Sequence, residues 1–308
     1  MSSNCTIGYT DLLRQKYECN LNDVGSTLIP TLNLLKSSIL VSFSGALRIH
    51  IAFILMHINS MFFNCLAGGL IIYAVYTLDR AMDAEEDIEN RPELKGASNK
   101  AALLVSLFCF VAGAAILTAN GLLLIAFLPL VTGYLYSKGL RIGKFNLRLK
   151  GSLGMKNLVV GITWGAFIAG IAGIYAAGII APIIVFTYFG MKLFINSTIY
   201  DFKDIKGDTL AGIKTLPVVL GERKAKIMLF SMHILSHLVL LLSIITGPIA
   251  FEPVIIAYSF LIGIIYIKNF AEQVEVETKK RLTKRLFMID GESTSIVGLR
   301  TIINGIIA

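Results

Sequence analysis

The feature of this sequence that most constrains its fold is a succession of apolar runs, each near the roughly 20 residues that a helix needs to cross a bilayer. Nine such runs follow one another along the 308-residue chain. They lie near Leu28–Leu47, Ile51–Leu78, Ala101–Thr118, Gly121–Tyr136, Leu158–Tyr175, Ile179–Tyr200, Ile227–Ile245, Ile249–Ile267 and Leu286–Ile307. The last is the most polar, because it carries Asp290, Glu292 and Arg300. Only 16% of all residues are charged, against roughly 25% in a soluble domain, so we predict an all-α, polytopic membrane protein with about nine transmembrane helices.

Residues 1–27 precede the first apolar run and are polar and mixed in charge. They lack the basic region leading directly into a short apolar region that marks a secretory signal. We therefore expect two parts, a cytoplasmic N-terminal segment over residues 1–27 and one transmembrane domain over residues 28–308.

Lysine and arginine residues divide the connections between the runs into two kinds. Four lie in residues 79–100, and six each lie in residues 137–157, 201–226 and 268–285. The alternate connections, at residues 48–50, 119–120, 176–178 and 246–248, together hold one basic residue, Arg48. Because basic loops stay on the cytoplasmic side, we predict that the N-terminus and the four long loops are cytoplasmic. This topology accounts for the net charge of +8, so we expect no nucleic-acid partner.

Two acidic clusters stand at the predicted cytoplasmic ends of the second and sixth runs. Each places three aspartates on one face of a helix, at i, i+4 and i+8 in the first cluster and at i, i+3 and i+7 in the second. The clusters consist of Asp79, Asp83 and Asp87, and of Asp201, Asp204 and Asp208. Stacked like charges destabilise a helix, and near lipid the cost rises, so a cation is expected to offset them. Oxygen ligands without histidine or cysteine favour Mg2+, which binds one or two carboxylates together with substrate phosphates.

The matching of the two clusters decides between two interpretations. Either cluster alone fits a solvated acidic helix end, but two clusters on one side of the membrane, four spans apart, favour the two halves of one metal–diphosphate site. The same spacing predicts two parallel four-helix repeats, arranged around a central cavity.

The motifs around these clusters resemble those of a known family. The segment from Asp201 to Gly221, which contains Gly-Ile-Lys-Thr-Leu-Pro, strongly resembles the second aspartate-rich motif of the UbiA-type intramembrane prenyltransferases. The first cluster resembles the Asn-x-x-x-Asp-x-x-x-Asp motif of that family, with Asp79 in place of the asparagine. Tyr136–Arg141 and Lys156–Asn157 resemble its basic loop after the fourth span, in a longer form. The resemblance covers most of the chain.

This resemblance implies Mg2+-dependent transfer of an isoprenyl group from a prenyl diphosphate to a lipophilic acceptor, a quinone precursor or a glycerol-phosphate lipid, in contact with membrane lipid. The implied metal ligands are Asp83, Asp87, Asp201 and Asp204, with Asp79 and Asp208 beside them. The candidate diphosphate-binding residues are Arg91, Lys138, Arg141, Lys156 and Lys214. Tyr200 is the aromatic residue expected to act in catalysis, by stabilising an allylic cation through its ring face.

Other functions stay open to different degrees. A transporter is disfavoured because the acidic residues lie at helix ends rather than near the bilayer midplane. A CDP-alcohol phosphatidyltransferase is disfavoured because its Asp-Gly-x-x-Ala-Arg signature is absent. A cyclase or diphosphatase variant of the same fold would share both clusters. The sequence leaves open the acceptor, the donor chain length, the oligomeric state and whether the last run spans the membrane.

Three residues inside the runs are polar enough to need an explanation. Lys192, in the sixth run, is expected to snorkel, to pair with an acid or to serve a function. His233 and His237 lie at i and i+4 in the seventh run without a third ligand nearby, so we expect helix packing rather than a zinc site.

Overall fold

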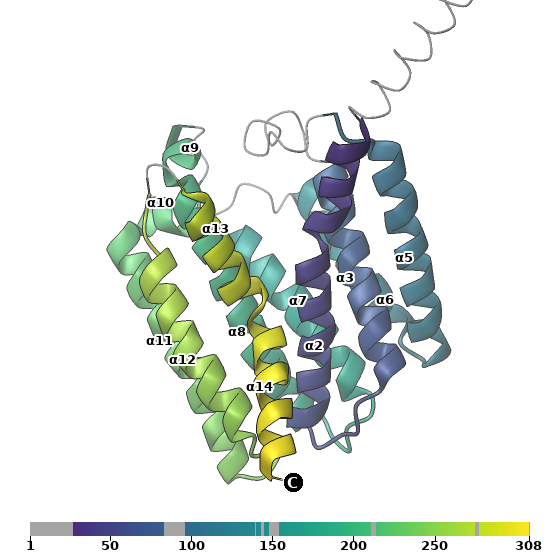
Figure 1. Ribbon diagram of the computed structural model, residues 1–308, viewed down its shortest axis with the longest axis vertical. Helices are drawn as coiled ribbons and strands as arrows, with labels where there is room; N and C mark the ends of the chain where they lie inside the picture. The colour runs from purple at the N-terminus through teal and green to yellow at the C-terminus, as the bar shows by residue number, and fades with distance from the viewer. Residues whose placement is uncertain are drawn as a thin grey trace, which may run out of the picture. The chain divides into compact units, whose positions relative to one another are not determined.

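The computed structural model describes residues 27–82, 96–138, 140–142, 145–147, 154–210, 214–274 and 277–307. Helices dominate these residues (Figure 1), which confirms the all-α class. In chain order the elements are α2 (Ile39–Leu55), α3 (Phe62–Met82), α5 (Asn99–Ala119), α6 (Leu123–Lys138), β1 (Leu140–Ile142), β2 (Phe145–Leu147), α7 (Met155–Gly173), α8 (Ile180–Asp201), the 3-10 helix η2 (Phe202–Asp204), α9 (Ile205–Leu210), α10 (Leu216–Leu220), α11 (Glu222–Ile245), α12 (Pro253–Phe270), α13 (Lys279–Arg285), the π-helix η3 (Leu286–Asp290) and α14 (Glu292–Ile307).

Seven helices in the described part of the chain are long and apolar enough to cross a membrane. They are Thr27–Leu55, Phe62–Ala81, Asn99–Ala119, Met155–Gly173, Ile180–Thr209, Glu222–Ile245 and Pro253–Phe270. The fourth predicted span is a shorter apolar helix, Leu123–Leu135. The ninth divides at Gly291 into η3 and the 16-residue α14. The number of nine spans therefore stays a prediction.

The structure corrects the predicted boundary between the first two spans. The helix Thr27–Leu55 continues through residues 48–50, and the chain turns only at residues 56–61, where His57 has a φ of 57°. Arg48 is buried, with 8% of its surface exposed. A charge within an apolar run suggests a loop, but no glycine or proline follows Gly45 before Leu55, so nothing interrupts the helical hydrogen bonding.

The chain forms two compact units. The first consists of Met1–Ile39 and Tyr73–Phe110, and the second of Leu40–Ile72 and Val111–Ala308. In the first unit, Leu34, Ala81 and Ala102 form a small buried core. Next to this core, Tyr73 Oη donates a hydrogen bond of 3.0 Å to the carbonyl oxygen of Leu35.

In the second unit, α7 packs closely against α8 because glycines line their crossing. A Cβ atom on Gly161 would lie 2.7 Å from the carbonyl oxygen of Gly190, and one on Gly165 would lie 2.9 Å from the Cα atom of Gly190. Small residues of this kind let helices approach in lipid. Further along the unit, α8 packs on α11, α11 on α12 and α12 on α14 (Figure 1). This packing places the first turn of α7 beside the last turn of α8.

A short antiparallel hairpin lies between α6 and α7, where the sequence predicts a basic loop. In it, β1 pairs with β2, and Arg141 lies opposite Asn146. Strands of three residues are too short to show an alternating pattern, so the hairpin was not predictable from periodicity.

Candidate active site

The second aspartate cluster lies on one continuous helical stretch. Asp201 ends α8, η2 carries Asp204 and α9 carries Asp208. The backbone stays in the right-handed helical region at Asp201 and Phe202, so the helix tightens here without ending. The three aspartates therefore lie on one helical stretch, but the 3-10 turn changes the α-helical spacing, and their shared face stays a prediction.

Asp201 is the most enclosed of these carboxylates, and its side chain is 2% exposed. Lys156 Nζ lies 3.1 Å from its Oδ1, and Asn157 Nδ2 donates a hydrogen bond of 2.7 Å to its Oδ2. Asn157 is held in turn by Ser197, whose Oγ donates to Asn157 Oδ1 at 2.6 Å. A buried carboxylate needs such partners to remain charged. The structure thus brings Lys156, a predicted diphosphate-binding residue, to the second cluster.

Asp204 and Asp208 have weaker partners than Asp201. The Asp204 side chain is 45% exposed and lies 3.7 Å from Lys203 Nζ, while Thr215 Oγ1 donates to Asp208 Oδ2 at 3.1 Å. The three carboxylates also repel one another electrostatically. This repulsion and the oxygen-only donors fit a hard divalent cation.

Tyr200 does not present two free ring faces to a substrate. The guanidinium of Arg285 lies 4.7 Å from the centre of its ring. Its hydroxyl donates a hydrogen bond of 2.5 Å to Asp290 Oδ2. The predicted role of Tyr200 in stabilising an allylic cation stays a prediction, with one ring face already occupied by a protein cation.

The other predicted site residues are described in part or not at all. Asp79 lies in the last turn of α3, Lys138 ends α6 and Arg141 lies in β1, and Lys214 is exposed before α10. Asp83, Asp87 and Arg91 lie outside the described residues. Within the described ranges, no three histidine, cysteine or acidic side chains form a group that could hold a metal ion. The site of six aspartates therefore stays a prediction.

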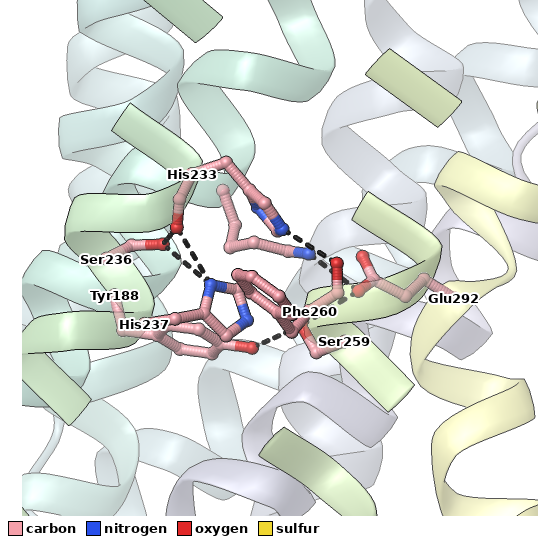
Figure 2. Close-up of polar contacts among 8 residues, drawn as sticks. Tyr188, His233, Ser236, His237, Ser259, Phe260 and Glu292 are labelled. Atoms are coloured by element: carbon pink, nitrogen blue, oxygen red, sulfur yellow. Dashed lines mark hydrogen bonds and ion pairs between the residues drawn. The ribbon is translucent and has the colours of Figure 1, made fainter. Parts of the chain in front are cut away.

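A buried polar network surrounds Lys192 in the second unit. Lys192 Nζ lies 2.6 Å from Glu292 Oε1, so the alternative in which it pairs with an acid is confirmed. Figure 2 shows Ser259 between Tyr188 and Glu292. Ser259 Oγ donates to Glu292 Oε1 at 3.0 Å and lies 2.6 Å from Tyr188 Oη.

The two histidines belong to the same polar interior (Figure 2). His233 Nε2 lies 3.0 Å from the carbonyl oxygen of Phe260, and His237 Nδ1 lies 2.9 Å from that of His233. His233 thus bonds to the backbone of α12 and His237 to the backbone of its own helix α11, as the packing interpretation predicts. Sequence reasoning missed Glu292 as the partner of Lys192, although its charge within an apolar run is itself a signal.

Several helices are apolar and long enough to span a membrane, and one of them ends in a buried carboxylate bonded to a lysine and an asparagine. These features define an integral membrane protein whose polar site lies at a helix end. A model of the UbiA prenyltransferase family matches residues 34–290. The chain belongs to the UbiA prenyltransferase family and is a membrane prenyltransferase.

Relatives of known name are also prenyltransferases. The chain is 27% identical over 239 residues to a digeranylgeranylglyceryl phosphate synthase of Sulfolobus acidocaldarius, covering 72% of this chain and 78% of that protein. It is 32% identical over 157 residues to the synthase of the same name from Thermococcus gammatolerans, covering 48% of this chain and 52% of that protein. The match thus spans about half of the second relative.

Solved structures share the fold. A UbiA homologue from Archaeoglobus fulgidus, bound to GPP and Mg2+, has a TM-score of 0.58 at 16% identity, with 87% of this chain and 99% of that chain covered. A UbiA homologue from Aeropyrum pernix without ligand has a TM-score of 0.60 at 16% identity, covering 86% and 97%. At this identity the likeness establishes the fold alone.

Proposed function

We propose that this chain transfers an isoprenyl group from a prenyl diphosphate to the hydroxyl group of a glycerol-phosphate lipid, with Mg2+ as cofactor. The observation that carries the proposal is the Asp201 carboxylate, buried at the end of α8 and held by Lys156 and Asn157. The relatives named above as digeranylgeranylglyceryl phosphate synthases support a glycerol-phosphate acceptor over a quinone precursor.

In this proposal the two aspartate clusters hold the metal through Asp79, Asp83, Asp87, Asp201, Asp204 and Asp208. The described donors fit Mg2+, which binds carboxylates and substrate phosphates and keeps several waters. Bound there, the cation would act as a Lewis acid on the leaving diphosphate. Structures of the Archaeoglobus fulgidus homologue contain GPP or DMAPP together with Mg2+. They support a prenyl diphosphate and Mg2+ as the molecules bound by this chain.

Other residues of the chain bind the diphosphate or orient the Asp201 carboxylate. Lys156, half exposed and next to Asp201, binds the diphosphate through a charge-assisted contact. Asn157 and Ser197 hold the Asp201 carboxylate in one orientation. Lys138, Arg141, Arg91 and Lys214 add positive charge around the diphosphate.

The transfer itself exchanges one bond for another. The bond between C1 of the prenyl group and the diphosphate oxygen breaks, and the electron pair leaves with the diphosphate. A lone pair of the acceptor hydroxyl oxygen then forms the new ether bond to C1, and the hydroxyl proton is released. Water must be excluded while the allylic carbon is cationic.

The basic loops support a cytoplasmic position for this site. The loop before α7 and the segments around α9, α11 and α13 carry most of the lysine and arginine residues, and the positive-inside rule places such segments in the cytoplasm. The N-terminus is proposed to lie on the same side.

The test uses the full chain in lipid nanodiscs with Mg2+, geranylgeranyl diphosphate and geranylgeranylglyceryl phosphate. We expect ether formation that is lost on chelation of Mg2+ and in Asp201→Asn. Prenylation of p-hydroxybenzoate instead would replace the acceptor class. Diphosphate release without any prenylated product would establish the diphosphatase or cyclase variant and overturn the transferase assignment.

A further inference from the structure

The C-terminal segment contacts α8 at two levels of that helix. Asp290, the last residue of η3, accepts a hydrogen bond from Tyr200, and Glu292, the first residue of α14, pairs with Lys192. Tyr200 and Lys192 are eight residues apart on α8, which corresponds to roughly 12 Å of helix. Figure 1 shows α13 and α14 following one another along this part of the unit. The π-helix between them is a rare conformation that occurs frequently at functional sites.

Arg285 is the unusual residue of this segment. It ends α13, where Lys279, Lys280, Arg281 and Lys284 are also basic. Its neighbours fit the positive-inside rule because they reach the surface, but Arg285 is buried, with 3% of its surface exposed. A buried guanidinium is costly, so a topological role alone does not explain it.

The contacts of Arg285 lead to the second aspartate cluster. Its guanidinium lies 4.7 Å from the centre of the Tyr200 ring, and its Nη2 lies 2.8 Å from Glu277 Oε2. Tyr200 directly precedes Asp201, so any rotation of the helix end that moves Tyr200 also moves the Asp201 carboxylate.

The end of α8 is therefore held by two sets of contacts. In the first set, Asn157 of α7 binds the Asp201 carboxylate. In the second, Asp290 binds the Tyr200 hydroxyl and Arg285 covers the Tyr200 ring. Because Mg2+ demands nearly ideal octahedral geometry, a small rotation of this helix end would weaken its coordination.

We propose that Arg285 is a positioning residue for the metal ligands of the second cluster: with Asp290 it fixes Tyr200, and thereby sets the orientation of Asp201 and Asp204. This inference rests on the proposed function, since it concerns the same metal site. In this proposal Arg285 acts through Tyr200 and is not itself a metal ligand.

The experiment measures binding of geranyl diphosphate to the purified full chain by isothermal titration calorimetry over a range of Mg2+ concentrations, without acceptor. In Arg285→Met, we expect the Mg2+ concentration for half-maximal binding to rise roughly 10-fold or more, as with other groups that orient metal ligands. Saturating Mg2+ should restore binding. A variant that is merely less stable would instead bind less geranyl diphosphate per protein molecule at every Mg2+ concentration.

Arg281→Met is the matched control. Arg281 lies one turn earlier on α13, pairs with Glu272 at 3.1 Å and lies 5.3 Å from the Phe270 ring. Arg281 thus has the same kinds of partner, but none of these contacts involves Tyr200. In Arg281→Met, the Mg2+ concentration for half-maximal binding should stay within about twofold of the parent value. Arg285→Lys should be intermediate, because lysine keeps the charge but cannot stack in the same way.

Two further variants keep the proposal testable should Arg285→Met fail to fold. Tyr200→Phe retains the ring and loses the bond to Asp290, and Asp290→Asn weakens the same bond; both should raise the Mg2+ requirement. A parental Mg2+ dependence in Tyr200→Phe and in the folded Arg285 variants overturns the inference but leaves the proposed function standing. Binding by the parent chain that does not need Mg2+ or Asp201 overturns the proposed function, and the inference with it.

Discussion

Asn157 Nδ2 and Asp201 Oδ2 are joined by a hydrogen bond of 2.7 Å that links the first turn of α7 to the last turn of α8. Both residues are buried, with 1% of their surface exposed. The bond orients one oxygen of the carboxylate, while Lys156 lies beside the other. The orientation of Asp201 therefore depends on the packing of two helices whose contacting residues are 44 positions apart.

Replacement of Asn157 should affect the metal site more than the fold. Asn157→Ala removes the donor to Asp201, and we expect a loss of roughly 10- to 100-fold in turnover at limiting Mg2+, as for other groups that hold a metal ligand. The measurement is the rate of prenyl transfer over a range of Mg2+ concentrations. Ser197→Ala, which removes only the bond to Asn157 Oδ1, is the control with a smaller expected loss. Equal and Mg2+-independent losses in both variants would contradict this role.

The contacts of Asp201 could be predicted only in part. The spacing of Asp201, Asp204 and Asp208 predicts their helix, and the resemblance of Lys156–Asn157 to a basic loop associates that segment with diphosphate. Neither pattern predicts that Asn157 and Asp201 touch. That contact arises from glycines on two helices, and helix packing in lipid depends on shape rather than on a periodic pattern.

Glycine substitutions in α7 should separate helix packing from helix propensity. A Cβ atom on Gly161 would lie 2.7 Å from the Gly190 carbonyl oxygen, whereas one on Gly133 of α6 meets nothing within 4 Å. We expect Gly161→Ala to destabilise by roughly 1–3 kcal/mol through overpacking. Gly133→Ala should be neutral or stabilising by up to about 1 kcal/mol, because alanine favours a helix. Thermal unfolding in detergent compares the two, and equal melting temperatures would show that the α7–α8 contact is not tight.

Removing one partner of the buried Lys192–Glu292 pair should strongly lower the free energy of unfolding. Both side chains are about 95% buried, so Glu292→Gln leaves an uncompensated charge, at a cost of roughly 3–5 kcal/mol. Arg48 lines the same small cavity as Lys192 and Glu292 and adds a second positive charge there. Lys192→Met should therefore cost less than Glu292→Gln, because Arg48 still lies near the acid.

The control for this pair lies nearby on α14. Arg300 binds Glu252 through two hydrogen bonds of 2.7 and 2.8 Å, but their side chains are 25% and 19% exposed. Glu252→Gln should cost about 1 kcal/mol or less, as for other solvated pairs. Unfolding in detergent measures all three variants. A Glu292→Gln protein as stable as Glu252→Gln would mean that the buried pair is solvated.

The partners of the buried charged residues could not be predicted from the sequence. Arg48 resembles a loop residue because it interrupts an apolar run, yet it lies within a helix and faces Lys192 and Glu292. Lys192 clearly needs a partner, but Glu292 is 100 residues away in a segment whose polarity argues against a span. Tyr200 and Asp290 pair over 90 residues. Local patterns predicted the apolar helices, whereas these contacts are tertiary.

Replacement of Lys156 should weaken donor binding specifically. Lys156 pairs with the buried Asp201, and 53% of its side chain is exposed, so we expect its ammonium group to contact a bound diphosphate as well. Loss of one hydrogen bond between charged groups costs roughly 1.5–3 kcal/mol, and we therefore expect Lys156→Met to raise the KM for prenyl diphosphate about 10-fold or more. The defect should shrink in high salt, where screening already weakens this contact in the parent. Lys224→Met, at an exposed position in the first turns of α11, removes an equal charge from the same predicted side and should leave KM unchanged. Equal KM changes in both variants would mean that Lys156 acts only through the overall basic character of this side.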